Sequence, residues 1–490
     1  MPASFIYTVY PYRPLFIHHV TSFHYKNGYE IVRINHYNYL VIDCFSGLSS
    51  TKIPMDWVAL FCLHPMAVYQ ITAFPFAILF SLLCFFGYLS VNARYIFLLL
   101  GGLALAFAAM GPYSLLVIIP AYCSVILFHS VGPESVHSWT FFFQMSWQTL
   151  CHLWLHYKAY YLQELASVRL SFAISSLMLL TQRVTSLALD IHEGKVKGNA
   201  ADSTLPGFSL RLPSYTAMPF FTYLLFFPSL LGGPLCSFAR FQSKIQQMST
   251  HRTLIPLWVA GQSCLLAIAL HFFKALVKGS LGVLTDFTSC TGFGCIYTMW
   301  TTTLVFKLVY YSQWLLDESL FMVAGFVSED GQENEEFLRD LSGTDLWTLE
   351  TTNRMSLFTR TWNKSTSQWL RRLVFQHSGH HPLLKTFAFS AWWHGLHPGQ
   401  IFGFLCWALM VEADYRIHPY YSSLVKSCHC WWLYKVFSWI QTQLIIAYIM
   451  SAIEMRHMPS LWKLCVSYGS FFPLLYCVSL LFLTKKKSRR

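Results

Sequence analysis

The stretch Tyr95-IFLLLGGLALAFAAMGPYSLLVIIPAYCSVILFHS-Val131 decides the fold class, because almost every residue in it is apolar. A membrane-spanning helix needs about 20 predominantly apolar residues, so the stretch is long enough for two helices. The Gly111-Pro112 pair within it predicts a tight turn between them. The sequence therefore predicts two apolar helices joined by a turn.

The composition of the whole chain extends this prediction. Of 490 residues, 55% are hydrophobic and only 11% are charged, against roughly 25% in soluble proteins. So few charges exclude a disordered chain and cannot cover a soluble surface. The net charge of +12 is typical of a membrane protein whose cytosolic loops are rich in Lys and Arg and contact anionic lipids. We therefore predict an all-α polytopic membrane protein with membrane lipids as partners and no nucleic-acid partner.

Apolar runs follow one another from Met55 onward, with short polar breaks between them. About eleven transmembrane helices are expected, and one segment near 354–385 is expected to be re-entrant. No internal repeat supports an inverted-repeat transporter. The candidate spans are roughly 66–90, 95–110, 113–131, 138–157, 168–189, 217–238, 254–273, 293–316, 386–411, 431–453 and 461–483.

The chain divides into three parts. Residues 1–54 form an extension without an apolar run, and a translation start at Met55 would make this extension dispensable. Residues 55–484 form the membrane domain, and residues 485–490 form a strongly basic tail. The excess of Lys and Arg in cytosolic loops places the tail and the basic segment 354–385 on the cytosolic side. The acidic stretch 328–345 is expected to be a solvated loop.

The run 386–411 is the most informative for chemistry. His394 and His397 are its only side chains suited to acid–base work near neutral pH. Ionisable residues within a membrane are costly and mark functional sites, and a neutral imidazole tolerates burial better than a full charge. Gly395 allows a substrate to approach the backbone, and Pro398-Gly399 is expected to interrupt the helix. A histidine that only hydrogen-bonds a neighbouring helix is the alternative.

The segment before this run combines tryptophans with cations, as expected for a segment at the membrane surface. Its cations can hold the phosphate groups of a nucleotide-bearing substrate or contact lipid headgroups. They are Arg360, Lys364, Arg371 and Arg372.

Two other kinds of site are not supported. The histidines between His377 and His397 have no carboxylate or cysteine at metal-ligand spacing, so no metal site is predicted. The chain also lacks the Gly-x-Ser-x-Gly elbow of serine hydrolases.

Trp393-His394-Gly395 within an apolar segment, preceded by Trp362-Asn363, resembles the paired signature of the membrane-bound O-acyltransferase family. Five longer segments resemble the branch of that family that acylates the peptide proghrelin. The resemblance covers residues 55 to about 485. The five segments are Phe143–His152, Leu179–Leu187, Tyr223–Gly233, Trp369–His377 and Phe387–Gln400.

This resemblance implies a membrane-bound O-acyltransferase domain over residues 55–484, in the endoplasmic reticulum membrane, with an internal catalytic tunnel. The implied reaction transfers a medium-chain acyl group, octanoyl, from acyl-CoA to a serine near the N-terminus of proghrelin. Acyl-CoA would enter from the cytosol and the peptide from the lumen. Acyl-CoA is then the donor, and no permanently bound cofactor is expected.

The family's catalytic pair matches His394 and Asn363. His394 is expected to act as general base, and Asn363 to polarise the thioester, stabilise the oxyanion or orient the nucleophile. The candidate substrate-binding residues are Arg360, Trp362, Lys364, Arg371, Arg372, Phe387, Trp392, Trp393 and Trp407.

Two other functions stay open at this point. One is a lysophospholipid or other lipid O-acyltransferase of the same family. The other is a non-enzymatic membrane protein, either a transporter or an inactive relative that binds acyl-CoA. The intact pair of Asn363 and His394 argues against the non-enzymatic alternative.

Overall fold

The computed structural model describes residues 65–164, 167–196, 214–248, 255–281, 292–326, 345–425 and 431–488. These residues form helices and helical turns and contain no strand, which confirms the all-α fold. The predicted extension 1–54 and all but the last residue of the acidic stretch 328–345 lie outside the described residues. The first part of the molecule contains α3 (Pro65–Phe85), α4 (Val91–Met110), η2 (Gly111–Ser114), α5 (Leu115–Ser130), α6 (Val136–His156), η3 (Tyr157–Tyr161), α7 (Val168–His192), α8 (Ser214–Leu224), η5 (Phe227–Ser229) and α9 (Phe238–Gln247).

The second part begins with two long helices and continues with a series of short ones. It contains α10 (Ile255–Leu281), α11 (Gly294–Val323), α13 (Leu346–Thr351), α14 (Met355–Thr361), α15 (Lys364–Leu370), η6 (Arg371–Phe375), α16 (Pro382–His394), α17 (Pro398–Val425), α18 (Trp431–Glu454), α19 (Met458–Val466), η7 (Tyr468–Ser470) and α20 (Phe471–Ser488). Helix α20 continues into the basic tail that was predicted to start at Lys485.

Five stretches of the described chain are long and apolar enough to cross a membrane. The bent pair Met458–Val466 and Tyr468–Phe482 makes a sixth when it is counted as one span. A polytopic membrane protein is therefore confirmed, but the predicted count of about eleven is not. The five stretches are Val68–Phe85, Val91–Ser130, Val168–His192, Trp258–Gly279 and Trp431–Glu454.

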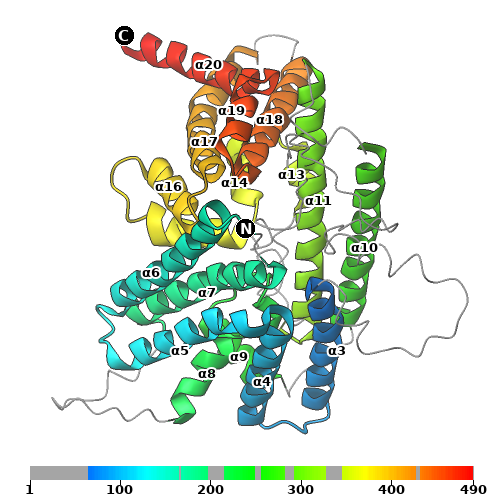
Figure 1. Cartoon of the computed structure of the whole chain (residues 1–490), viewed down its shortest axis with the longest axis vertical. Coiled ribbons are helices and arrows are strands. Elements are labelled where there is room, and N and C mark those ends of the chain that lie inside the picture. Colours follow the sequence, from blue (N-terminus) through cyan, green and yellow to red (C-terminus); the bar gives the residue numbers. More distant parts are fainter. Residues whose placement is uncertain are drawn as a thin grey trace, which may run out of the picture.

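The helices form two groups with a segment of shorter helices between them (Figure 1). Helices α3 to α9 occupy one end of the view, and α17 to α20 occupy the other. The long helices α10 and α11 lie side by side along the flank. The yellow segment that contains α14 and α16 lies between the two groups, so elements from both can position it.

Helix α7 is the internal helix of the first group. It begins where the Ser167 hydroxyl accepts a hydrogen bond from the Leu170 amide at 3.2 Å. Its apolar window is entirely buried in protein, whereas only 11% of the α10 window is buried. The guanidinium of Arg183 donates to the carbonyl oxygens of Leu224 and Ser229, each at 2.7 Å. Polar residues on α7 are therefore paired inside the protein and do not face lipid.

Helix α7 also holds the short helix α15. The amide of Gln182 donates to the Thr366 hydroxyl at 2.8 Å, and the indole of Trp369 donates to the Thr185 hydroxyl at 2.9 Å. Helices α13, α14 and α15 have only six or seven residues each, too few to cross a bilayer. Of these, α14 and α15 lie within the segment 354–385 that was expected to be re-entrant.

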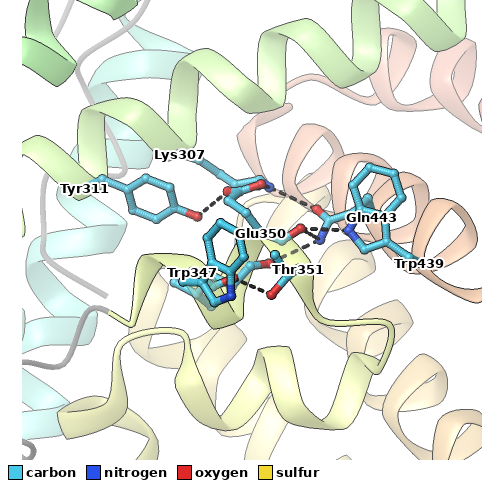
Figure 2. Close-up of polar contacts among 8 residues, drawn as sticks. Lys307, Tyr311, Trp347, Glu350, Thr351, Trp439 and Gln443 are labelled. Carbon is cyan, nitrogen blue, oxygen red and sulfur yellow. Dashed lines mark hydrogen bonds and ion pairs between the residues drawn. The ribbon is translucent and has the colours of Figure 1, made fainter. Parts of the chain in front are cut away.

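A polar network anchors α13 to the long helices (Figure 2). The carboxylate of Glu350 accepts hydrogen bonds from Lys307 at 2.9 and 3.0 Å and from Tyr311 at 2.6 Å, both on α11. The backbone carbonyl of Glu350 accepts a bond at 2.7 Å from Trp439 on α18. Tyr311 and Trp314 pack against Trp362, the residue just before Asn363. The network therefore fixes the start of the segment that carries the predicted asparagine.

The predicted span 386–411 is interrupted, as expected, but the interruption lies before Pro398 and not at it. Helix α16 ends at His394, where Gly395 adopts φ of 113° and Leu396 adopts φ of 60°. Pro398 does not interrupt a helix but begins α17, a position that suits its fixed φ and missing N–H. The break therefore precedes Pro398 and places His394 at a helix end.

Candidate active site

A cavity of about 540 Å³ lies among α14, α15, η6, α16 and α17. Both predicted catalytic residues, His394 and Asn363, line it. Two sequence segments that were singled out separately therefore meet at one site. Seven of the nine predicted substrate-binding residues also line it: Arg360, Trp362, Lys364, Arg371, Phe387, Trp393 and Trp407.

His394 is the last residue of α16, and its side chain is buried with 2% exposure. Its ring stacks on Phe404 with a centroid distance of 4.9 Å and meets the Trp393 ring at 4.8 Å. Within the described ranges, no hydrogen-bond partner of the imidazole is found. A buried imidazole that no described residue hydrogen-bonds, on the wall of a cavity, is suited to exchange a proton with a bound molecule.

Asn363 occupies the turn between α14 and α15 in the left-handed conformation, with φ of 46°. Asparagine tolerates this conformation better than most residues. Its Oδ1 accepts hydrogen bonds from the Thr366 amide at 3.4 Å and the Ser365 hydroxyl at 3.3 Å, so it caps α15. Because the oxygen is used in this way, the Nδ2 amino group is the part of the side chain available to donate to a ligand.

The cations at the cavity differ from His394 in exposure. Arg360 and Arg371 are exposed, and Lys364 is half-buried. Arg360 donates to the Tyr415 hydroxyl at 3.1 Å and lies over the Tyr415 ring. Arg371 forms no ion pair with any described residue. The cavity therefore joins an exposed cationic mouth to a buried wall that carries His394.

Two predicted substrate-binding residues do not line the cavity. Arg372 forms ion pairs with Asp190 at 2.8 Å and Glu193 at 3.0 Å, at the end of α7. Hydrogen bonds from Lys195 and Arg372 hold the pKa of the Glu193 carboxyl below its usual value, although partial burial acts to raise it. The indole of Trp392 donates to the Thr149 hydroxyl on α6 at 3.0 Å. Both side chains hold neighbouring elements in place.

The sequence analysis missed three lining residues near the histidine, which are Thr386, Ser390 and Phe404. Thr386 and Ser390 precede His394 by two turns and one turn of the same helix. This spacing places all three on one face and was available as a signal. Phe404 follows the helix break, so no spacing rule pointed to it. Hydroxyls and aromatic rings thus line the wall around the imidazole.

Comparison with known proteins agrees with this geometry. The family model described as "MBOAT, membrane-bound O-acyltransferase family" matches residues 42–453. Membrane-bound ghrelin O-acyltransferase MBOAT4 of Rattus norvegicus is 52% identical over 437 residues, which cover 89% of this chain and 100% of that protein. The protein of the same name from Mus musculus is 53% identical over 439 residues, with the same coverage.

A more distant relative has a different printed activity. Membrane-bound glycerophospholipid O-acyltransferase 2 of Homo sapiens is 27% identical over 478 residues, which cover 90% of this chain and 88% of that protein. The family match spans most of the chain, and the cavity brings together the histidine and asparagine of the family signature. The chain therefore belongs to the membrane-bound O-acyltransferase family and is an acyltransferase.

Proposed function

We propose that this enzyme transfers octanoyl from octanoyl-CoA to a serine hydroxyl near the N-terminus of proghrelin, in the endoplasmic reticulum membrane. The observation that carries the proposal is one cavity that combines His394, Asn363 and an exposed cationic mouth, in a chain about half identical to two ghrelin O-acyltransferases. The peptide acceptor is inferred from the names of those relatives, and the octanoyl chain from the resemblance to the peptide-acylating branch of the family.

The shape and charge of the cavity support acyl-CoA as the donor. Arg360, Lys364 and Arg371 would bind the phosphate groups of CoA at the mouth, where guanidinium and ammonium groups form charge-assisted hydrogen bonds. Phe387 and Trp407 would contact the apolar chain. With the phosphates at the exposed end, the thioester is directed towards the buried imidazole.

The chemistry then follows from two side chains. The imidazole of His394 takes the proton from the acceptor serine as its oxygen attacks the thioester carbonyl carbon. The Nδ2 group of Asn363 donates a hydrogen bond to the carbonyl oxygen, which gains negative charge in this step. The C–S bond breaks when the tetrahedral intermediate collapses, and the CoA thiolate leaves. The imidazolium returns its proton to the thiolate, which restores the neutral base.

The identity with a glycerophospholipid O-acyltransferase supports a second candidate acceptor, a lysophospholipid. The same pair of residues can activate a lipid hydroxyl by the same steps. The higher identity to the two peptide acyltransferases favours the peptide.

The test is acyl transfer in microsomes that contain the full chain, with octanoyl-CoA and either an N-terminal proghrelin peptide or a lysophospholipid. Wild type is compared at matched protein level with His394→Ala, Asn363→Ala and His380→Ala. His380 is a matched control, because it is an exposed histidine of the same region that does not line the cavity.

The proposal expects acyl-peptide from wild type and His380→Ala, with losses of about 10²–10⁴-fold in His394→Ala. Asn363→Ala is expected to lose about 10²–10³-fold. Product that persists in His394→Ala would remove His394 as the base. Acyl transfer only to the lysophospholipid would replace the proposed acceptor with the second candidate.

A further inference from the structure

Three residues of α6 hydrogen-bond the backbone on both sides of His394. Gln148 Nε2 donates to the carbonyl oxygen of Trp393 at 2.5 Å, and His152 Nε2 lies 3.3 Å from the same oxygen. One turn further along, His156 Nε2 lies 2.5 Å from the carbonyl oxygen of Gly395. Gln148, His152 and His156 are four residues apart, so they form one stripe on a single face of α6.

These contacts complete the end of α16. The last carbonyl groups of a helix lack partners within the helix. The amides of Gly395 and Leu396 satisfy the carbonyls of Trp392 and Ala391, at 3.1 and 3.0 Å. The carbonyls of Trp393, His394 and Gly395 have no backbone amide partner among the described residues, and the stripe on α6 supplies partners for those of Trp393 and Gly395. A carbonyl oxygen only accepts, so His156 must carry its proton on Nε2 to make this bond.

The stripe is itself held in place. The hydroxyl of Thr181 on α7 donates to Gln148 Oε1 at 2.8 Å, which turns the Nε2 group of Gln148 towards α16. On the facing side, a Cβ added at Gly395 would lie 2.8 Å from His152 Nδ1. The backbone after His394 therefore lies directly against α6, with no space for a side chain at Gly395.

We propose that Gln148, His152 and His156 are positioning residues that set the direction of the His394 imidazole. Since no described residue hydrogen-bonds that ring, its direction depends on the backbone at the end of α16 and on packing against Trp393 and Phe404. Misplacement of a reacting group by about 1 Å can reduce turnover about 10²-fold. The inference rests on the proposed role of His394 as general base, but not on the identity of the acceptor.

The experiment compares His156→Leu, which removes the donor, with His156→Gln, which supplies an amide donor of similar reach. His156 is half-buried, so substitution there disturbs packing less than at the buried His152. His129→Leu is the matched control, because His129 also contacts a backbone carbonyl, that of Val125 at 2.9 Å, but on its own helix α5. Gln148→Met is a second variant that leaves His152 beside the Trp393 carbonyl.

The measured quantities are kcat and KM for octanoyl-CoA at matched amounts of folded protein. We expect His156→Leu to lower kcat about tenfold or more, with the KM for octanoyl-CoA within about twofold of wild type, because the stripe does not line the cavity. His156→Gln should recover most of the kcat, and His129→Leu should match wild type. Gln148→Met should lower kcat severalfold and provides the same comparison if His156→Leu does not fold.

The inference is overturned if His156→Leu keeps its kcat, or if the Gln variant is as impaired as the Leu variant. Failure of the proposed function looks different, because wild type would then make no acyl-peptide. In that case the same variants are compared with the lysophospholipid acceptor, since the direction of the imidazole matters for either hydroxyl.

Discussion

Arg371 and Arg372 are adjacent in the chain, but their side chains lie in different surroundings. Arg371 lines the cavity, whereas Arg372 forms ion pairs with Asp190 and Glu193 at the end of α7. Both belong to the π-helical turn η6, and such turns often occur at functional sites. The turn thus places one guanidinium at the cavity, and the next guanidinium attaches the turn to the end of α7.

Arg371→Gln is expected to raise the KM for octanoyl-CoA about tenfold with little change in kcat, because a charge-assisted hydrogen bond contributes about 1.5–3 kcal/mol. A matched assay uses the octanoyl thioester of N-acetylcysteamine, which has no phosphate groups. The KM for that donor should be unchanged by the substitution. An equal rise for both donors would show that Arg371 does not act through phosphate.

The pairing of Glu193 with Lys195 and Arg372 gives a pH dependence with a definite sign. Because the pKa of Glu193 is lowered in the folded protein, its contribution to stability is complete above the unfolded value of about 4.3. It disappears as the pH falls through the folded pKa. Glu193→Gln should therefore unfold slightly earlier than wild type at pH 7, by less than about 1 kcal/mol for this exposed pair. The difference should vanish in acid and shrink at high salt, and a difference that grows in acid would contradict the pairing.

Asn363→Asp separates the two functions of that side chain. The carboxylate still caps α15, since its oxygen can accept from the Thr366 amide. It cannot donate to the thioester oxygen, and its negative charge opposes an oxyanion. Turnover should fall about 10²–10³-fold while the thermal unfolding temperature stays close to that of wild type. Near-normal turnover would limit Asn363 to the helix cap.

Gly395→Ala tests the close approach of α6 to the helix end. The new Cβ would meet His152 at 2.8 Å, at a backbone φ of 113°. Gly87→Ala is the matched control, because Gly87 also has a positive φ, of 74°, but no atom within 4 Å of the added Cβ. Both variants carry a backbone cost of about 1 kcal/mol. Only Gly395→Ala should also lose acyl transfer, by tenfold or more, and equal activity of the two would argue against the contact.

The network of Figure 2 predicts that the stability of the protein depends on the ion pair between Lys307 and Glu350. Lys307 is 6% exposed and the Glu350 side chain is 39% exposed. Glu350→Ala leaves the buried ammonium without its counterion, so stability should fall by about 1–3 kcal/mol, less than for a fully buried pair because the carboxylate is partly exposed and Gln443 still accepts from Lys307. The double variant Lys307→Met with Glu350→Ala should recover a substantial part, as measured by thermal unfolding. No recovery would mean that the loss comes from the unanchored α13 and not from the unpaired charge.

The sequence was sufficient for the fold class and for finding two residues, His394 and Asn363, that meet at one cavity, because both depend on strong local signals. Long apolar runs require helices in a membrane, and His394 and Asn363 belong to a short signature of distinctive residue types. The number of spans was not predictable from apolar character alone. Helix α6, for example, is apolar enough to be taken as a span, but its polar stripe contacts the end of α16.

Other parts of the site depend on contacts that residue type does not encode. Arg371 and Arg372 are chemically identical, and only the path of a π-helical turn separates the residue that lines the cavity from the residue that is ion-paired. The carbonyls of Trp393 and Gly395 are backbone atoms, so no side-chain pattern in α16 indicates that α6 will bind them. Partners about 240 residues apart in the chain can be identified only in the folded molecule.

The burial of the apolar window of α7 has a consequence for biosynthesis. During translation, α7 is synthesised long before α15, the short helix that it holds. The hydrogen bond from Gln182 cannot form until Thr366, which lies 184 residues further along the chain, has been synthesised. At roughly 5–20 residues per second, this delay is on the order of 10–40 s. During that interval the Gln182 amide must hydrogen-bond water, a chaperone or an earlier helix. Packing of α15 against α7 is therefore a late step of assembly, and it requires that the helices before it are already folded.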